Sequence, residues 1–223
     1  MKRFLLSWSS GKDSAWALHV LRRDPAIQVC GLLTTINAGF QRVAMHGTRY
    51  SVLEAQARAA GLPLWPVPLP WPCSNETYEN RMGEVCARAV AEHVEGVAFG
   101  DLYLEDVRAY REKQLAPTGL EPLFPLWGIP TAELAREMIA GGLRARLTCV
   151  DPRALPAAFA GRKFDEALLR DLPPSVDPCA ERGEFHTCAC AGPMFTEPLS
   201  LVPGEVVSRD GFVFADFELL KSD

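Results

Sequence analysis

The sequence predicts an α/β protein with a doubly wound parallel sheet and a smaller α+β part at its C-terminal end. Three observations predict this fold. Short apolar runs alternate with segments of helical periodicity from residue 4 to residue 150. A turn rich in serine and glycine joins the first apolar run to the first helix. From residue 151 onward the alternation gives way to a stretch rich in proline and alanine, followed by strand-like segments.

The first junction between a strand and a helix is the strongest candidate for a binding site. Residues 4–6 form a short apolar strand, and residues 15–21 have helical periodicity. Asp13 or Ser14 is expected to cap this helix. Backbone N–H groups and the positive end of the helix dipole converge at such a junction and favour a phosphate chain. The expected phosphate-binding residues are Ser9, Ser10, Gly11, Lys12, Asp13 and Ser14.

The pattern at this junction narrows the kind of phosphate site. A P-loop has a glycine five residues before its Gly-Lys pair and a serine or threonine after it. Here Leu6 and Asp13 occupy those positions. The dinucleotide-binding pattern needs three spaced glycines, whereas Gly11 stands alone. The segment resembles the pyrophosphate-binding loop of the N-type ATP pyrophosphatases, and the alternative is an ordinary Ser/Gly turn before a helix.

The remaining segments continue the alternation of strands and helices. Residues 37–50 are loop-like, and the prolines at 66 and 68 place their strand at a sheet edge. Further strands are predicted at 27–36, 64–69, 97–101, 123–128 and 144–150, and helices at 51–60, 77–94, 106–114 and 131–139. In the C-terminal part a helix is predicted at 165–172 and strands at 184–190, 205–208 and 212–219. Arg209-Asp210-Gly211 is expected to form a hairpin turn.

The composition limits the partners of this protein. Its 223 residues are enough to bury a full core, and 48% of them are hydrophobic. A formal net charge of −5 argues against nucleic acid as a partner. The apolar run at 4–6 is too short for a signal peptide, and no run is long enough to cross a membrane. Seven cysteines without an export signal indicate reduced thiols and a cytoplasmic location.

Further candidate residues follow the predicted strands, where an open parallel sheet binds its ligands. Thr34 follows the second strand and is placed beside the adenine, and Gly100 and Asp101 follow the fourth. Asp101 suits Mg²⁺ or a substrate amine, because Mg²⁺ takes one or two carboxylates plus phosphate oxygens. The alternative for Asp101 is a helix cap. Arg108 and Arg111 share a helix face that suits a phosphate or, equally, salt bridges on a solvated surface.

A second cluster of titratable residues lies between residues 177 and 187. Glu184 and His186 alternate on a predicted strand, and Glu181 precedes them by one turn. A histidine between carboxylates suits proton transfer near neutral pH. The alternative is a polar turn before an edge strand. Cys179, His186, Cys188 and Cys190 also allow a zinc interpretation, but they lack the C-x-x-C spacing of structural zinc sites.

Three patches together extend the resemblance beyond one loop. They are residues 8–14, the run from Phe99-Gly100-Asp101 to Pro125-Leu126-Trp127, and Gly183-Glu184-Phe185-His186-Thr187 with Gly192-Pro193-Met194-Phe195. In these patches the chain resembles the diphthine–ammonia ligase family of adenine nucleotide alpha hydrolase-like proteins. This resemblance implies a HUP-type, Rossmann-like ATP-binding domain at residues 1–130 and a substrate domain at residues 131–223.

The resemblance also implies an activity, in which ATP adenylates a substrate carboxylate, pyrophosphate leaves, and ammonia displaces AMP. The implied cofactors are ATP and Mg²⁺, with Asp13 and Asp101 as metal ligands. Asp101, Glu181, Glu184 and His186 are the implied catalytic residues. Thr34, Gly100 and Thr187 join the loop residues 9–14 as nucleotide-binding residues, with Thr187 near the acceptor or ammonia side.

The sequence departs from the family on the acceptor side. Arg182 replaces an asparagine, and Cys188 and Cys190 replace aromatic residues. The composition is typical of a bacterium, where diphthine is absent, so we expect another small-molecule or protein carboxylate as the acceptor. A homodimer is expected because related pyrophosphatases often pair. Two other functions stay open at this point, namely a tRNA-modifying ATP pyrophosphatase and a non-catalytic adenine-nucleotide sensor.

Overall fold

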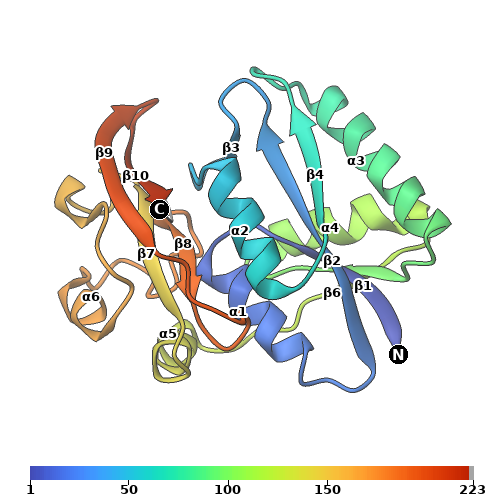
Figure 1. The fold of residues 1–223 in the computed structure, drawn as a ribbon, viewed down its shortest axis with the longest axis horizontal. Coiled ribbons are helices and arrows are strands. Elements are labelled where there is room, and N and C mark those ends of the chain that lie inside the picture. The colour runs from blue at the N-terminus through green and yellow to red at the C-terminus, as the bar shows by residue number, and fades with distance from the viewer. Residues whose placement is uncertain (221–223) are drawn as a thin grey trace.

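The computed structural model describes residues 1–220 and contains two β-sheets that lie side by side (Figure 1). The first sheet has the strand order β3-β2-β1-β5-β6, and β4 also pairs with β2. Its strands are β1 (Lys2–Ser7), β2 (Ile27–Asn37), β3 (Arg42–Val43), β4 (Leu64–Leu69), β5 (Gly96–Ala98) and β6 (Glu121–Leu123). All of its pairings are parallel except that of β3 with the end of β2. The doubly wound α/β fold is thereby confirmed.

The second sheet is antiparallel, with the order β8-β7-β10-β9. Its strands are β7 (Arg144–Val150), β8 (Phe185–Ala191), β9 (Leu201–Arg209) and β10 (Phe212–Leu219). The predicted turn between the last two strands is present, with Asp210 and Gly211 at positive φ, as a tight hairpin requires. The predicted smaller α+β part is therefore also present.

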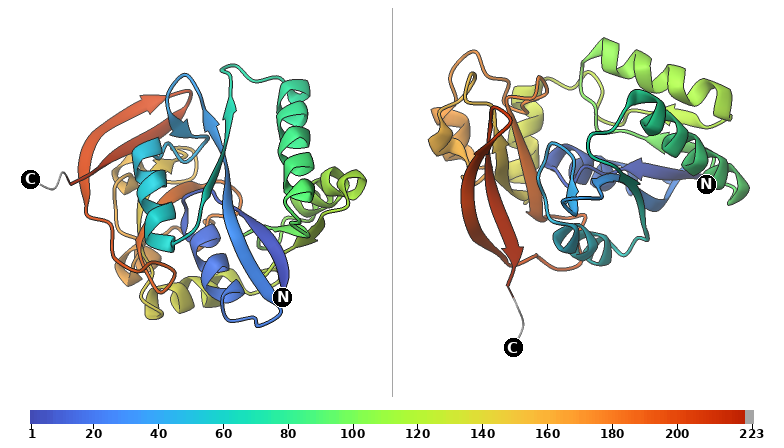
Figure 2. Two further views of the ribbon diagram at one scale, coloured as in Figure 1. Left: turned by 45° about the vertical axis from the view of Figure 1, so that its right-hand side comes forward. Right: turned by 90° about the horizontal axis from the view of Figure 1, so that it is seen from above.

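Helices cover both faces of the first sheet, as two further views show (Figure 2). Two of them, α1 and α2, lie between the sheets, where α1 contacts β8 and α2 contacts β10. The α-helices are α1 (Lys12–Leu21), α2 (Tyr50–Ala60), α3 (Asn75–Ala91), α4 (Glu105–Leu115), α5 (Thr131–Ala140) and α6 (Glu166–Asp171). Short 3₁₀ turns occur at Ala116–Thr118 and Ala157–Phe159. No helix within residues 1–220 is long and apolar enough to span a membrane.

Successive side chains along β1 belong alternately to two hydrophobic cores. Phe4 and Leu6 point into a core that continues across α1 into the second sheet, whereas Leu5 points to the opposite face. There Leu5 packs with Val97 and with residues of α3 and α4. The larger core thus joins the two sheets into one packed body.

Three expectations about these elements are wrong. Residues 144–150 form a strand of the second sheet, because an apolar run does not indicate which sheet it joins. The strand expected at 123–128 ends at Leu123, and residues 124–127 form a turn closed by the Trp127 N–H on the Phe124 carbonyl. Gly11, and neither Asp13 nor Ser14, occupies the cap position of α1, and no side chain caps this helix.

Candidate functional site

The loop between β1 and α1 has a fixed conformation at the carboxyl edge of the parallel strands. Ser10 is fully buried and has a φ of 70°, which is unusual for a residue with a side chain. Its hydroxyl donates to Thr48 Oγ1 at 2.7 Å. Its carbonyl accepts from the Ala189 N–H at 2.9 Å and from Gln56 Nε2 at 3.0 Å. Partners from α2, its preceding loop and β8 therefore maintain the strained conformation of this loop.

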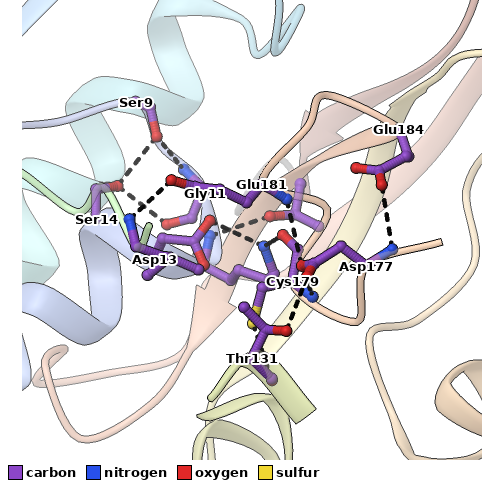
Figure 3. Close-up of polar contacts among 12 residues, drawn as sticks. Ser9, Gly11, Asp13, Ser14, Thr131, Asp177, Cys179, Glu181 and Glu184 are labelled. Carbon is purple, nitrogen blue, oxygen red and sulfur yellow. Dashed lines mark hydrogen bonds and ion pairs between the residues drawn. The ribbon is translucent and has the colours of Figure 1, made fainter. Parts of the chain in front are cut away.

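Hydroxyl and N–H groups of Ser9, Gly11 and Ser14 lie close together at the loop (Figure 3). Ser9 Oγ lies 3.2 Å from Ser14 Oγ and 3.3 Å from the Gly11 nitrogen. Ser9 also lines a cavity of about 180 Å³ at the ends of β1, β2 and β5, which we call the smaller cavity. Thr35 and Arg111 border the same cavity. This arrangement suits a phosphate chain that enters the space beside Ser9.

The side chain of Lys12 does not lie in the position expected of a phosphate-binding lysine. Its side chain is 2% exposed and points into the junction between the sheets. The ammonium donates to Asp13 Oδ2 at 2.9 Å and to the Cys179 carbonyl, and it lies 5.6 Å from the rings of Phe164 and Phe185. Burial opposes its charge, but Asp13 outweighs this effect, so the pKa of Lys12 is raised. The ammonium thus has partners within the protein.

Three carboxylates form an acidic group beside the loop. Asp13 Oδ1 and Asp101 Oδ2 are buried and accept no hydrogen bond. Glu181 accepts the Leu102 N–H at 2.7 Å. Burial raises the pKa of Asp13 and of Asp101, and it raises the pKa of Glu181 to about 7, with a further contribution from the other two charges. A carboxylate with a pKa near neutrality suits proton transfer.

Arg111 is a second cation, besides Lys12, that faces this acidic group. Its Nε lies 3.5 Å from Asp101 Oδ2, an ion-pair distance without hydrogen-bond geometry, and its guanidinium stacks over Phe99. Arg108 instead pairs with Glu112 at 2.8 Å on the exposed face of α4. The two arginines therefore do not act as one phosphate clamp. Arg111 alone points toward the site.

Metal binding would rest on few ligands. Among residues 1–220 there is no group of three or more His, Cys, Asp or Glu side chains that could hold a metal ion, so the zinc interpretation has no support. The unpartnered oxygens of Asp13 and Asp101 fit the alternative, in which Mg²⁺ binds one or two carboxylates together with phosphate oxygens.

The segment after α6 is organised by two carboxylates (Figure 3). Asp177 accepts from Thr131 Oγ1 at 2.8 Å and from the Cys179 N–H at 2.8 Å. Glu184 is buried and accepts the N–H groups of Asp177 and Arg182, both at 3.1 Å. Glu184 therefore fixes the turn that carries Glu181, and its carboxylate is occupied by backbone donors.

His186 lies against a second histidine that the sequence analysis missed. The rings of His46 and His186 are 4.7 Å apart, and burial lowers their pKa values to about 4 and about 3. His46 Nδ1 lies 2.9 Å from the Thr187 carbonyl, so this nitrogen carries the proton. Both rings are neutral at physiological pH. Residues 42–48 follow the second strand of the sheet, and this position was the signal that could have identified His46.

Thr187, Gly100 and Thr34 also lie at the loop, each in a packing role. Thr187 Oγ1 accepts the Lys12 N–H at 3.0 Å, and a Cβ on Gly100 would lie 3.0 Å from the Ser14 nitrogen. Thr34 is buried and donates to the Trp8 carbonyl at 2.8 Å, so its hydroxyl is turned away from the smaller cavity that its neighbour Thr35 lines. Thr187, Thr34 and Gly100 therefore lie against the junction of β1 with α1, whereas Glu184 contacts the backbone of the segment after α6.

Comparisons with known proteins identify the family of this chain. A family model described as the diphthamide synthase N-terminal domain matches residues 1–122. The proteins named diphthine–ammonia ligase in Mus musculus and Rattus norvegicus are each 29% identical to this chain over 135 residues. These alignments cover 58% of this chain and 51% of each relative, so the chain spans about half the length of the curated relatives it matches. With more than half of its length matched by the family model, the chain belongs to the diphthamide synthase family.

Proposed function

We propose that this protein is an ATP-dependent ligase that activates a carboxylate as its adenylate and transfers ammonia to it. The observation that carries the proposal is the position of the Ser9–Ser14 loop directly beside the acidic group of Asp13, Asp101 and Glu181. The name diphthine–ammonia ligase of the mammalian relatives supports the same chemistry.

The reaction proceeds in two displacements. The β- and γ-phosphates of ATP bind the hydroxyl and N–H groups of Ser9, Gly11 and Ser14, and the adenosine occupies the smaller cavity. An oxygen of the acceptor carboxylate attacks the α-phosphorus, and the bond to pyrophosphate breaks. Ammonia then attacks the acyl carbon, and the bond to AMP breaks. The unprotonated Glu181 accepts the proton that the nitrogen loses.

Other residues of the site hold these groups in place. Arg111 faces the acidic group and offsets the negative charge that gathers there. Glu184 holds the turn that carries Glu181, and His46 supports the loop at Gly11, where a Cβ would lie 2.7 Å from the histidine ring. Mg²⁺, held by Asp13 and Asp101, would neutralise phosphate charge when bound.

Product analysis tests the proposal. The purified protein is incubated with ATP, Mg²⁺, ammonium and pooled cell metabolites, and the nucleotide products are separated. We expect AMP and pyrophosphate, and at least tenfold less of both with Asp13→Ala or Ser9→Ala, because loss of one preorganised group at a reacting phosphate costs about 3 kcal/mol. Glu84→Ala, an exposed position on α3, serves as the control. ADP and phosphate as products would exclude chemistry at the α-phosphorus, and full activity in both loop variants would exclude this loop as the site.

A further inference from the structure

A second, larger cavity of about 490 Å³ lies between the two sheets and has no place in the nucleotide site described above. We call it the larger cavity. It opens between residues 37–49, the end of β4 and the β9–β10 hairpin. Its volume falls within the range of sites that bind small molecules. Most of its lining is apolar, and the apolar residues include Phe40, Met45, Leu69, Trp71, Val207 and Phe214.

Apolar side chains at the mouth of this cavity are exposed to an unusual extent. Trp71 is 65% exposed, Met45 52% and Phe40 49%. The rings of Phe40 and Trp71 lie 6.4 Å apart at a tilt of 58°. Single exposed apolar residues are common on protein surfaces and need no explanation. A cluster of exposed aromatic side chains at the mouth of a concave site is instead typical of ligand binding.

The charged residues of the cavity are balanced, and three of the six are paired with one another. Asp216 accepts from Arg42 at 2.7 Å and from Arg49 at 2.5 Å. The remaining charged lining residues are Arg209, Glu205 and Asp210. Three cations thus face three anions, and the cavity offers no net charge to a ligand. The part of a ligand that enters it is therefore uncharged and mainly apolar.

One polar atom inside the larger cavity lacks a partner. Thr148, on β7, is 3% exposed and lines the cavity, and its Oγ1 makes no hydrogen bond. A buried hydroxyl without a partner is costly. A polar atom on the ligand would satisfy it, because a hydroxyl both donates and accepts.

The larger cavity adjoins the smaller one. Val43 and Ala44 line both, and the same segment supplies His46 and Thr48 to the phosphate-binding loop. A ligand in the larger cavity therefore lies next to the nucleotide, separated from it by two small side chains. This adjacency favours the second substrate over an unrelated ligand.

We propose that the larger cavity binds the apolar body of the acceptor, a small carboxylic acid whose aryl or alkyl group carries a polar atom directed at Thr148. The inference rests on the proposed ligase function and names the class of its acceptor. The acid extends past Val43 and Ala44, so that its carboxylate faces the α-phosphorus.

Calorimetric titration without ATP tests the site separately from the reaction. The probes are phenylacetate, 4-hydroxyphenylacetate, 3-(4-hydroxyphenyl)propanoate, octanoate and glutamate. We expect the apolar acids to bind and glutamate not to bind. Thr148→Val should weaken a hydroxylated acid by about threefold to tenfold and leave phenylacetate unchanged, since only the former loses a hydrogen bond. Unfolding by urea should be no easier for Thr148→Val, because its hydroxyl has no partner to lose.

A matched pair of variants on β9 locates the binding. Val207→Trp fills the cavity and should abolish binding, whereas Val202→Trp lies on the same strand, is similarly exposed and does not line the cavity. Competition by ATP would show that the nucleotide occupies the larger cavity and would overturn the proposal. So would the absence of binding by every apolar acid, or, in a protein that forms AMP and pyrophosphate with pooled metabolites, bound acids that do not stimulate release of pyrophosphate. Failure of the ligase function itself would appear as ADP formation, while binding of the acids persists.

Discussion

At the scale of single residues, the site depends on carboxylates kept near one another and partly removed from water. Glu181 interacts with both Asp13 and Asp101, and each of the three has a raised pKa. Such a group retains protons to a higher pH than in the unfolded chain. In the proposed reaction, a nucleotide with its cation would use two of these charges, and the third would accept a proton.

The pKa of Glu181 leads to a prediction on stability. In the folded state its pKa is about 7, whereas the ordinary pKa of a glutamate is 4.5. Because the folded state then binds more protons than the unfolded state, the free energy of unfolding should fall as the pH rises from about 4.5 to about 7. In Glu181→Gln this fall should be smaller, since the amide does not titrate and still accepts the Leu102 N–H. Urea unfolding at pH 5 and pH 8 measures the difference, and equal slopes in the two proteins would contradict the assignment.

The carboxylate of Glu181 should also determine how the rate of the proposed reaction depends on pH. With the free ammonia concentration held constant, the rate should rise with pH through an apparent pKa near 7 as the group of three carboxylates loses its proton. Glu181→Gln should remove this rise and lower the rate at pH 8.

Lys12 shows why residue type alone is a weak guide to a role. A lysine beside a glycine at a helix start favours phosphate binding, although the residues around Lys12 do not complete a P-loop. Its partners, Asp13 and the Cys179 carbonyl, include a residue far along the chain. The long-range contact that occupies the ammonium arises from the packing of the second sheet against α1.

At the scale of elements, the sequence predicted most helices and strands of the first sheet because their apolar periodicity is strong. Their pairing partners were predicted less well. The apolar pattern of a strand such as β7 is compatible with either sheet. A strand of only two residues, such as β3, has no periodicity at all. The loop that contains β3 also carries His46, so the site was incomplete where the local pattern was weakest.

The junction of β5 with α1 depends on one small residue. A Cβ on Gly100 would lie 3.0 Å from the Asp13 carbonyl carbon and 3.0 Å from the Ser14 nitrogen, and backbone atoms cannot give way as a flexible side chain does. Gly100→Ala should therefore lower the free energy of unfolding by about 1–3 kcal/mol and weaken ATP binding. Gly83→Ala is the matched control, since Gly83 lies in α3 with open space around it. This substitution should stabilise the protein by about 0.5–1 kcal/mol. Similar stability in both variants would show that β5 and α1 are not tightly packed.

At the scale of the whole molecule, the site is an assembly of both sheets. The Ala189 N–H donates to the Ser10 carbonyl, and Thr187 accepts the Lys12 N–H, so β8 fixes the loop of the first sheet. Gln56 links Trp8, Ser10 and Ala189 in the buried space between them. A sequence motif can identify the loop, but it cannot show that a strand more than 170 residues away holds it in shape.

The shared core predicts that the two parts unfold together. Trp8 and Leu18 belong to the same buried cluster as Leu147 and Phe185, so residues 1–130 alone would expose a large apolar face. We expect a fragment of residues 1–130 to lack a cooperative unfolding transition. In the full chain, far-UV circular dichroism reports both sheets, whereas fluorescence reports the surroundings of the five tryptophans, which all belong to the first part, at positions 8, 16, 65, 71 and 127. Coincident urea transitions by these two probes would indicate a single cooperative unit. A fragment that unfolds cooperatively would instead make residue 130 the boundary of an independent domain, and the loop would then keep its shape without β8.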